Sequence, residues 1–308
     1  MKKSIGLILG IVVLLAVTLG IVAVQADSVI IPDGDYTIVN NGVYQLSSGY
    51  SGVITVSNAV YEVTVTDSVY KTPHEETRIY IAEGRTEALE LTIEDLDMSA
   101  SLSSVIDLRN AGSYDNKLYI SGICNLTGEN SAPLHVPEGV QLTVDKKEST
   151  DNDEYAQLIV VNNGWHSAGI GGDASEETGT INIMGGTIKA TGGMYSAGIG
   201  GGFGGSGGNI TISGGVVEGI GGIQGAGIGG GVGATGGNIT ITGGTVTAIS
   251  RFGGAGIGGG TDFEDEVNDG GNITISGGHV RAISGGYGAG IGGGNEGSGG
   301  NITINGGY

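Results

Sequence analysis

Acidic side chains are concentrated in one short stretch of the sequence, where their carboxylates could bind a cation. The run TDFEDEVNDGG contains Asp262, Glu264, Asp265, Glu266 and Asp269. Calcium prefers such oxygen ligands, but the spacing matches neither an EF-hand loop nor the glycine-aspartate nonapeptide that binds calcium in some β-helices. A bound calcium ion is therefore one hypothesis and a solvated acidic loop is the simpler one, and no other cofactor is indicated.

No group of residues has the spacing of a catalytic site. A polysaccharide lyase or hydrolase needs clustered carboxylates, often with a basic residue as general base. The outward positions of one predicted strand in successive repeats instead carry a surface charge ladder of Lys189, Glu218, Thr247 and Arg281. The four histidines show no metal-ligand spacing, and the single cysteine, Cys124, alternates in step with leucines and is predicted to be buried. The sequence thus predicts a protein without enzymatic activity and without catalytic residues.

Aromatic side chains recur at one position of a repeat and could bind sugar rings. Two or three residues before each Ala-Gly-Ile-Gly element stands a large side chain in four of five repeats, namely Trp165, Tyr195, Phe252 and Tyr287. Exposed aromatic faces in a row suit stacking against sugars. The alternative is that these rings cover glycines at the corners and close the ends of the core.

A second regular array is polar. The element Asn-Ile-Thr-Ile places threonines on the outward face of a predicted strand at Thr211, Thr240, Thr274 and Thr303, and each follows an asparagine by two residues. Such a flat array of hydroxyls and amides could match a polysaccharide surface or ice, although the soluble side of a regular strand stack has the same composition. The asparagines are predicted to form a stacked amide row.

These residues are positioned by an internal repeat. Its Gly-Ile-Gly-Gly element begins at Gly169, Gly198, Gly227, Gly256 and Gly290, which gives steps of 29, 29, 29 and 34 residues. The extra five residues fall in the acidic stretch, as expected when insertions are confined to one loop of stacked repeats. Within each unit NITI and TVTA alternate with the period of a strand, and Gly-Gly pairs separate them.

The repeat predicts an all-β fold, a right-handed parallel β-helix with coils of about 29 residues in the C-terminal half. Parallel strands need long connections, which one coil provides, and isoleucines at three fixed positions would form columns in a common interior. We divide the chain into residues 1–26, a signal peptide; 27–84, N-terminal β coils or a cap; 85–166, irregular coils; and 167–308, regular coils.

The N-terminus and the charge indicate an exported protein that does not bind nucleic acid. Lys2 and Lys3 precede an apolar stretch that ends near Val24-Gln25-Ala26, which is typical of a cleaved signal peptide. An uncleaved membrane anchor is the alternative, because the stretch is long enough to span a bilayer. The net charge of −20 repels a phosphate backbone. We therefore predict a secreted or cell-surface location.

The segments LTIEDLDMSA, GICNLTGENSAPLHVPEGVQLTV and the repeated GGNITISGG resemble the glycine-rich β-helical repeats of bacterial extracellular proteins, described as carbohydrate-binding-domain or pectate-lyase-like proteins. The resemblance covers residues from about 85 to 308, and it implies an adhesin-like or structural protein with polysaccharide or cell-wall glycan as partner. A polysaccharide lyase or hydrolase and an ice-binding protein are the alternatives. Because the sequence stops at NITINGGY before a second strand, we also expect either end-to-end stacking of chains or a further C-terminal region.

Overall fold

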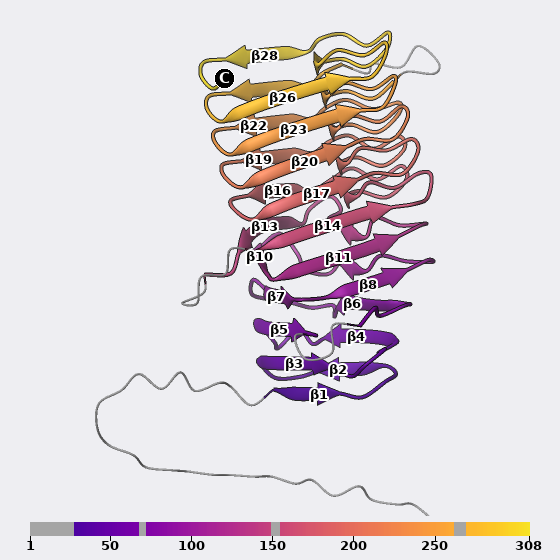
Figure 1. Ribbon diagram of the computed structural model, residues 1–308, viewed down its shortest axis with the longest axis vertical. Coiled ribbons are helices and arrows are strands. Elements are labelled where there is room, and N and C mark those ends of the chain that lie inside the picture. Colours follow the sequence, from indigo (N-terminus) through magenta and orange to yellow (C-terminus); the bar gives the residue numbers. More distant parts are fainter. Residues whose placement is uncertain (1–27, 68–71, 149–154, 262–268) are drawn as a thin grey trace, which may run out of the picture.

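The computed structural model describes residues 28–67, 72–148, 155–261 and 269–308. In these residues the chain winds into a right-handed parallel β-helix whose three parallel sheets run along one axis, with the first coils at one end and the C-terminus at the other (Figure 1). The named strands pair in parallel throughout the described part, so the predicted fold is confirmed. We number the sheets 1 to 3 in the order in which a regular coil enters them.

Sheet 1 contains eleven strands, one from each coil. They are β1 (Val29–Ile31), β3 (Gly42–Leu46), β5 (Glu62–Thr66), β7 (Glu90–Glu94), β10 (Asp115–Ser121), β13 (Gln141–Lys146), β16 (Thr180–Ile183), β19 (Asn209–Ile212), β22 (Asn238–Ile241), β25 (Asn272–Ile275) and β28 (Asn301–Ile304).

Sheet 2 begins later and contains seven strands. They are β8 (Asp97–Ala100), β11 (Ile123–Gly128), β14 (Gln157–Asn162), β17 (Thr187–Thr191), β20 (Val216–Ile220), β23 (Thr245–Ser250) and β26 (His279–Ser284).

Sheet 3 contains ten strands, most of them very short. They are β2 (Tyr36–Ile38), β4 (Gly52–Val56), β6 (Thr77–Ile81), β9 (Ile106–Asp107), β12 (Leu134–His135), β15 (Ile170–Gly171), β18 (Ile199–Gly200), β21 (Ile228–Gly229), β24 (Ile257–Gly258) and β27 (Ile291–Gly292). In the described residues the three coils before β7 therefore have two named strands each, the seven coils from β7 to β27 have three, and the last coil has only β28.

The isoleucine columns line the interior. Ile199 pairs with Ile228 and Ile228 with Ile257 in sheet 3, and the two isoleucines of each NITI strand stack in sheet 1 in the same way. These side chains are buried in the central coils. In β28, the edge strand of sheet 1 in the described residues, Ile302 and Ile304 are 40% and 60% exposed. Burial of the columns removes apolar surface from water, which is the main stabilising contribution of such a stack.

The glycine that ends the short sheet-3 strands β15, β18, β21 and β24 is required by the close approach of the next coil. In Gly229 the φ angle is 135°, in a region that side chains rarely adopt, and a Cβ atom there would overlap the carbonyl oxygen of Gly258 in the next coil. Gly200 and Gly258 have the same environment. Only a residue without a side chain fits at this position of the regular coils.

The other structural predictions concern the loops and the N-terminus. The insertion of the longest repeat falls between β24 and β25, as predicted, but its residues 262–268 lie outside the described part. Cys124 in β11 is buried, also as predicted. In the described ranges no helix is long and apolar enough to cross a membrane, and the predicted signal peptide lies outside them.

Candidate binding site

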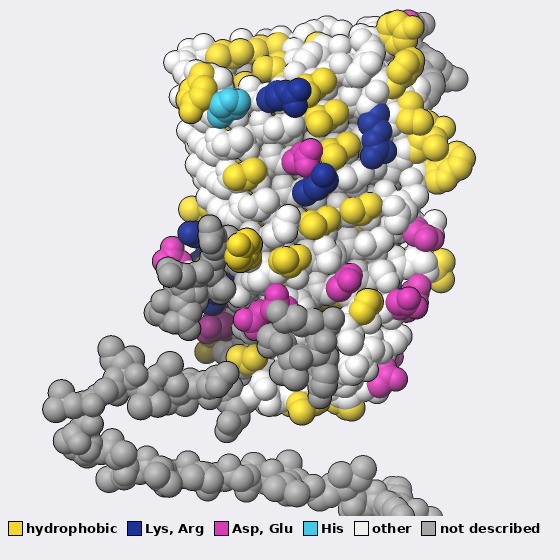
Figure 2. Space-filling model, viewed as in Figure 1, with side chains coloured by type: hydrophobic (Ala, Val, Ile, Leu, Met, Phe, Trp, Pro, Cys, Tyr) yellow, Lys and Arg dark blue, Asp and Glu magenta, His cyan; other side chains and the backbone are white. Residues whose placement is uncertain are grey.

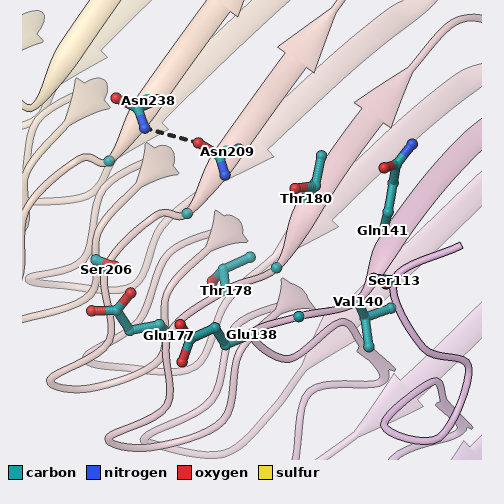
Figure 3. Close-up of a pocket in the computed structure, with 14 residues that line it drawn as sticks. Ser113, Glu138, Val140, Gln141, Glu177, Thr178, Thr180, Ser206, Asn209 and Asn238 are labelled. Carbon is teal, nitrogen blue, oxygen red and sulfur yellow. Dashed lines mark hydrogen bonds between the residues drawn. The ribbon is translucent and has the colours of Figure 1, made fainter. Parts of the chain in front are cut away.

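A groove follows the turns that connect sheet 3 to sheet 1. It consists of two overlapping parts of about 450 and 690 Å³ that share Glu177, Ser206, Gly237 and Asn238. Figure 3 shows Gln141, Thr180, Asn209 and Asn238 in one row, with Glu138 and Glu177 on the opposite side. The groove is thus lined by amides, hydroxyls, carboxylates and glycine backbone, which suit a ligand rich in hydrogen-bonding groups.

Parallel register creates this row. Gln141, Thr180, Asn209 and Asn238 are the first residues of β13, β16, β19 and β22, and each is paired with the next across the sheet. Asn272 and Asn301 continue the row and line the second part of the groove. Because coils are stacked at the spacing of strands, about 4.8 Å, the row offers an equivalent polar group at each such step.

The predicted amide row is present. Nδ2 of Asn238 donates to Oδ1 of Asn209 at 2.8 Å, and the same bond joins Asn272 to Asn238 and Asn301 to Asn272 at 2.8 and 2.9 Å. Each bond uses one N–H of the donor amide and one lone pair of the acceptor oxygen. A second N–H and a second lone pair of the central asparagines therefore remain for other partners.

The threonines predicted as ligand contacts lie on the outer face of sheet 1. Thr211 pairs with Thr240, Thr240 with Thr274 and Thr274 with Thr303, so their side chains form one column two residues along the strands from the amide row. Three are half-buried and Thr303 is exposed. This column and the groove belong to the same sheet, at different distances from the turns.

The predicted aromatic side chains form two pairs rather than one continuous row. Trp165 and Tyr195 pack edge to face with ring centres 6.1 Å apart, and Phe252 and Tyr287 do so at 5.2 Å. Ile223 occupies the coil between the pairs and is exposed. Trp165 is 57% exposed and Tyr287 is 71% exposed, so ring surface remains accessible to a ligand.

Further rings accompany the first pair, and these the sequence analysis did not predict. His166 stacks on Tyr195 with ring centres 5.8 Å apart, and Phe203 from the turn after β18 packs against both. Figure 2 shows hydrophobic side chains along the upper part of the right edge of the molecule, where the later strands of sheet 2 end in Figure 1. This apolar stripe follows the corner between sheets 2 and 3, whereas the groove follows the turns between sheets 3 and 1.

Several of the charged residues that the sequence analysis named contact other protein groups. Lys189 and Glu218 form an ion pair at 3.0 Å on the outer face of sheet 2, as the predicted ladder requires. Of the residues predicted to bind calcium, Asp262, Glu264, Asp265 and Glu266 lie outside the described part. Asp269 lines the groove, and its carboxylate accepts a hydrogen bond from the backbone N–H of Gly271 at 2.9 Å.

A buried histidine and three carboxylates form a cluster that the sequence analysis missed. His135 ends β12 and is 2% exposed. Its Nδ1 lies 3.0 Å from Oδ1 of Asp107 in the preceding coil, and its Nε2 lies 2.6 Å from Oε2 of Glu176 in the turn after β15. Oδ2 of Asp173 in the same turn is 3.9 Å from Nε2. The cluster therefore connects three successive coils, and its His135, Asp173 and Glu176 could hold a metal ion.

The carboxylates favour the charged form of His135. Burial lowers the pKa of His135, but the hydrogen bonds with Asp107 and Glu176 outweigh burial and raise the pKa to about 9. Burial also favours protonated Asp107, yet hydrogen bonds from His135 and from Arg109, whose Nε is 2.7 Å from Oδ2, lower the pKa of Asp107 to about 2. The hydrogen bond from His135 likewise lowers the pKa of Glu176.

Comparison with known proteins supports the fold and does not extend to an activity. The family model described as Beta helix repeat matches residues 181–203, 239–261 and 273–295. Each match begins at the first buried isoleucine of a sheet-1 strand and ends just after the short sheet-3 strand of the same coil. No curated protein and no solved structure matched the chain. Fold and repeat together define a parallel β-helix repeat protein.

Proposed function

We propose that this chain is an exported, non-enzymatic β-helix protein, adhesin-like or structural, that binds polysaccharide along the groove between sheets 3 and 1. The observation that supports the proposal is the row of Gln141, Thr180 and asparagines at the groove. Sugar hydroxyls both donate and accept hydrogen bonds, and a side-chain amide can do the same. An extended glycan lying along the helix axis would meet an equivalent group at each coil.

The charge of the groove selects among glycans. Glu138 and Glu177 are exposed carboxylates at its wall, and the whole chain carries a net charge of −20. A polyuronate such as pectin would be repelled by these groups. The proposed ligand is therefore a neutral glycan such as cellulose or chitin, with the aromatic pairs as a second contact for sugar rings.

A binding assay with matched variants tests this proposal. The full chain is incubated with insoluble cellulose, chitin, peptidoglycan and pectin, and the bound fraction is measured. Replacing Asn209 and Asn238 together by alanine should lower the affinity for the preferred glycan about tenfold or more, because the hydrogen bonds of both amides to the ligand are lost. Thr247→Ala on sheet 2 is the control and should bind as the wild type does. Absence of binding to all four materials would remove the glycan from the proposal.

The role of the aromatic pairs needs a separate variant. Trp165→Ala combined with Tyr195→Ala removes one exposed pair, and unchanged binding would confine the site to the groove.

Export is tested by the mass of the native protein, since removal of residues 1–26 shortens the chain by a known amount.

Ice binding is the second candidate, because the threonine column is regular and in register. It predicts thermal hysteresis that Thr240→Val or Thr274→Val changes while Thr247→Val leaves it intact. A solution without hysteresis would remove this candidate.

A further inference from the structure

The hydrogen bond between Nδ1 and Asp107 fixes the orientation of the His135 ring, so that its Nε2 faces the carboxylates of Glu176 and Asp173. With Nδ1–H donated to Asp107, the neutral imidazole directs the lone pair of Nε2 toward Glu176 and Asp173. A lone pair and a carboxylate oxygen 2.6 Å apart repel each other, so a proton or another cation must lie between them. Histidines that bind metals commonly donate their other N–H to a carboxylate in this way.

The distances fit a shared ion after a small adjustment. Ligand atoms bound about 2.1 Å from a tetrahedral ion lie roughly 3.4 Å apart. The separations of Nε2 from Glu176 Oε2 and from Asp173 Oδ2, 2.6 and 3.9 Å, lie on either side of that value. The Glu176 side chain is 37% exposed and can move outward, while the backbone N–H of Ala132 holds the other oxygen of Asp173 at 2.6 Å.

The charges also favour a divalent cation. Asp107, Asp173 and Glu176 contribute three negative charges, and Arg109 contributes one positive charge next to Asp107. Once Nε2 has given up its proton to make way for the ion, the group carries a net charge of −2, which one divalent ion balances. Acidic side chains in a solvated loop are surrounded by water, whereas these carboxylates face an imidazole that is almost completely buried.

We propose that His135 Nε2, Asp173 and Glu176 bind one divalent transition-metal ion, of which Zn²⁺ is the first choice, with Asp107 as the positioning residue. Imidazole nitrogen suits zinc, whereas calcium prefers ligand sets made of oxygen alone. When the ion binds, the proton on Nε2 leaves to solvent and the ion takes its place between the nitrogen and the carboxylates. The ion would add a link between coils that strand pairing and the hydrogen bond from Ala132 to Asp173 already join. None of its ligands belongs to the acidic stretch 262–269.

Titration with ZnCl₂ alone tests the site. The full chain without a histidine tag, freed of metal with a chelator, is titrated by calorimetry and should bind one equivalent of Zn²⁺. Asp173→Asn and Glu176→Gln should each weaken binding at least tenfold, and Asp107→Asn should weaken it about 10-fold to 100-fold. Glu129→Gln changes an exposed carboxylate that belongs neither to the cluster nor to the groove, and it should leave the affinity unchanged.

A spectroscopic measurement distinguishes coordination from loose binding. Co²⁺ added to the wild type should give a visible absorption band that Glu176→Gln abolishes, while far-UV circular dichroism confirms that both proteins are folded. The proposal is overturned if the wild type binds no stoichiometric Zn²⁺, or if the double variant Asp173→Asn/Glu176→Gln binds Zn²⁺ with the affinity of the wild type.

Discussion

A methyl group added at Gly229 measures how closely the coils are stacked. The Cβ of Gly229→Ala would overlap backbone atoms of Gly258 in β24, which cannot rotate away as a side chain could. The φ angle of 135° adds strain of about 1 to 3 kcal/mol. Separating the coils would also weaken the bonds from Ile228 N to Gly256 O and from Gly230 N to Gly258 O, at about 1 kcal/mol each. We therefore expect a loss of roughly 3 to 5 kcal/mol in the free energy of unfolding.

Two other glycines separate the contributions to this loss. Gly139 has a φ angle of 82°, but no atom lies within 4 Å of the position that a Cβ atom would take. Gly139→Ala should therefore lower the free energy of unfolding only by the backbone strain, about 1 to 2 kcal/mol. Gly299 has open space and no unusual φ, so Gly299→Ala should change the stability by less than about 0.5 kcal/mol.

Urea unfolding followed by far-UV circular dichroism gives the three values. Hydrogen exchange at β21 and β24 shows whether the loss is local, because stacked repeats can open in one region while the rest stays folded. An equal loss for Gly229→Ala and Gly139→Ala would refute the argument, since contact between coils would then add nothing to the backbone strain.

Two further predictions concern buried side chains. Ile228→Ala should lower the free energy of unfolding by about 2 to 5 kcal/mol, because it opens a cavity in a central coil. Ile302→Ala changes a partly exposed side chain and should lower it by about 1 kcal/mol or less. Urea unfolding of the two variants gives both values. Burial raises the pKa of the Cys124 thiol to about 12, so folded protein at pH 9 should react with a maleimide far more slowly than protein in urea. As the pH rises from 9 toward 12 the unfolded chain loses the thiol proton first, so the same group lowers stability there. Rapid labelling of folded protein would contradict the burial of Cys124.

The regular coils could be predicted because one physical constraint repeats in them. Each regular coil buries isoleucines at the same positions, and its backbone approaches the next coil at the same glycine. The spacing of these residues therefore predicts which sheet each strand joins, which face it buries and how it pairs with its neighbours. The sequence of the coils before β7 has no constant repeat period, so only the structure shows that each of these coils has two strands. The amide row was predictable for the same reason as the columns, since identical residues at identical positions of parallel coils must stack.

The histidine cluster could not be found by spacing along the chain. Glu176 is 41 residues from His135, and the two meet only because β12 pairs with β15. A signal was nevertheless present. Aligning VIDL and PLHV with the later Gly-Ile-Gly-Gly elements would place Asp107 and His135 in the column occupied by Gly171 and Gly200. The absence of a side chain on Gly171 leaves the imidazole facing the turn of the next coil. The gap in the aromatic row had a similar signal, because Ile223 replaces a ring in that coil.

The cluster and the groove share one turn, and this links the two proposed sites. Glu176 faces His135, whereas Glu177, the next residue, lines the groove with Thr178 (Figure 3). An ion bound by Asp173 and Glu176 would hold this turn at two points and so order the groove wall before a glycan binds, which reduces the entropy lost on binding. We therefore expect Zn²⁺ to raise the glycan affinity of the wild type severalfold, and Glu176→Gln to remove that increase without abolishing binding in the absence of metal. Equal glycan affinity with and without Zn²⁺, in a protein shown to bind the ion, would mean that the turn is already ordered by its own hydrogen bonds and that the two sites act independently.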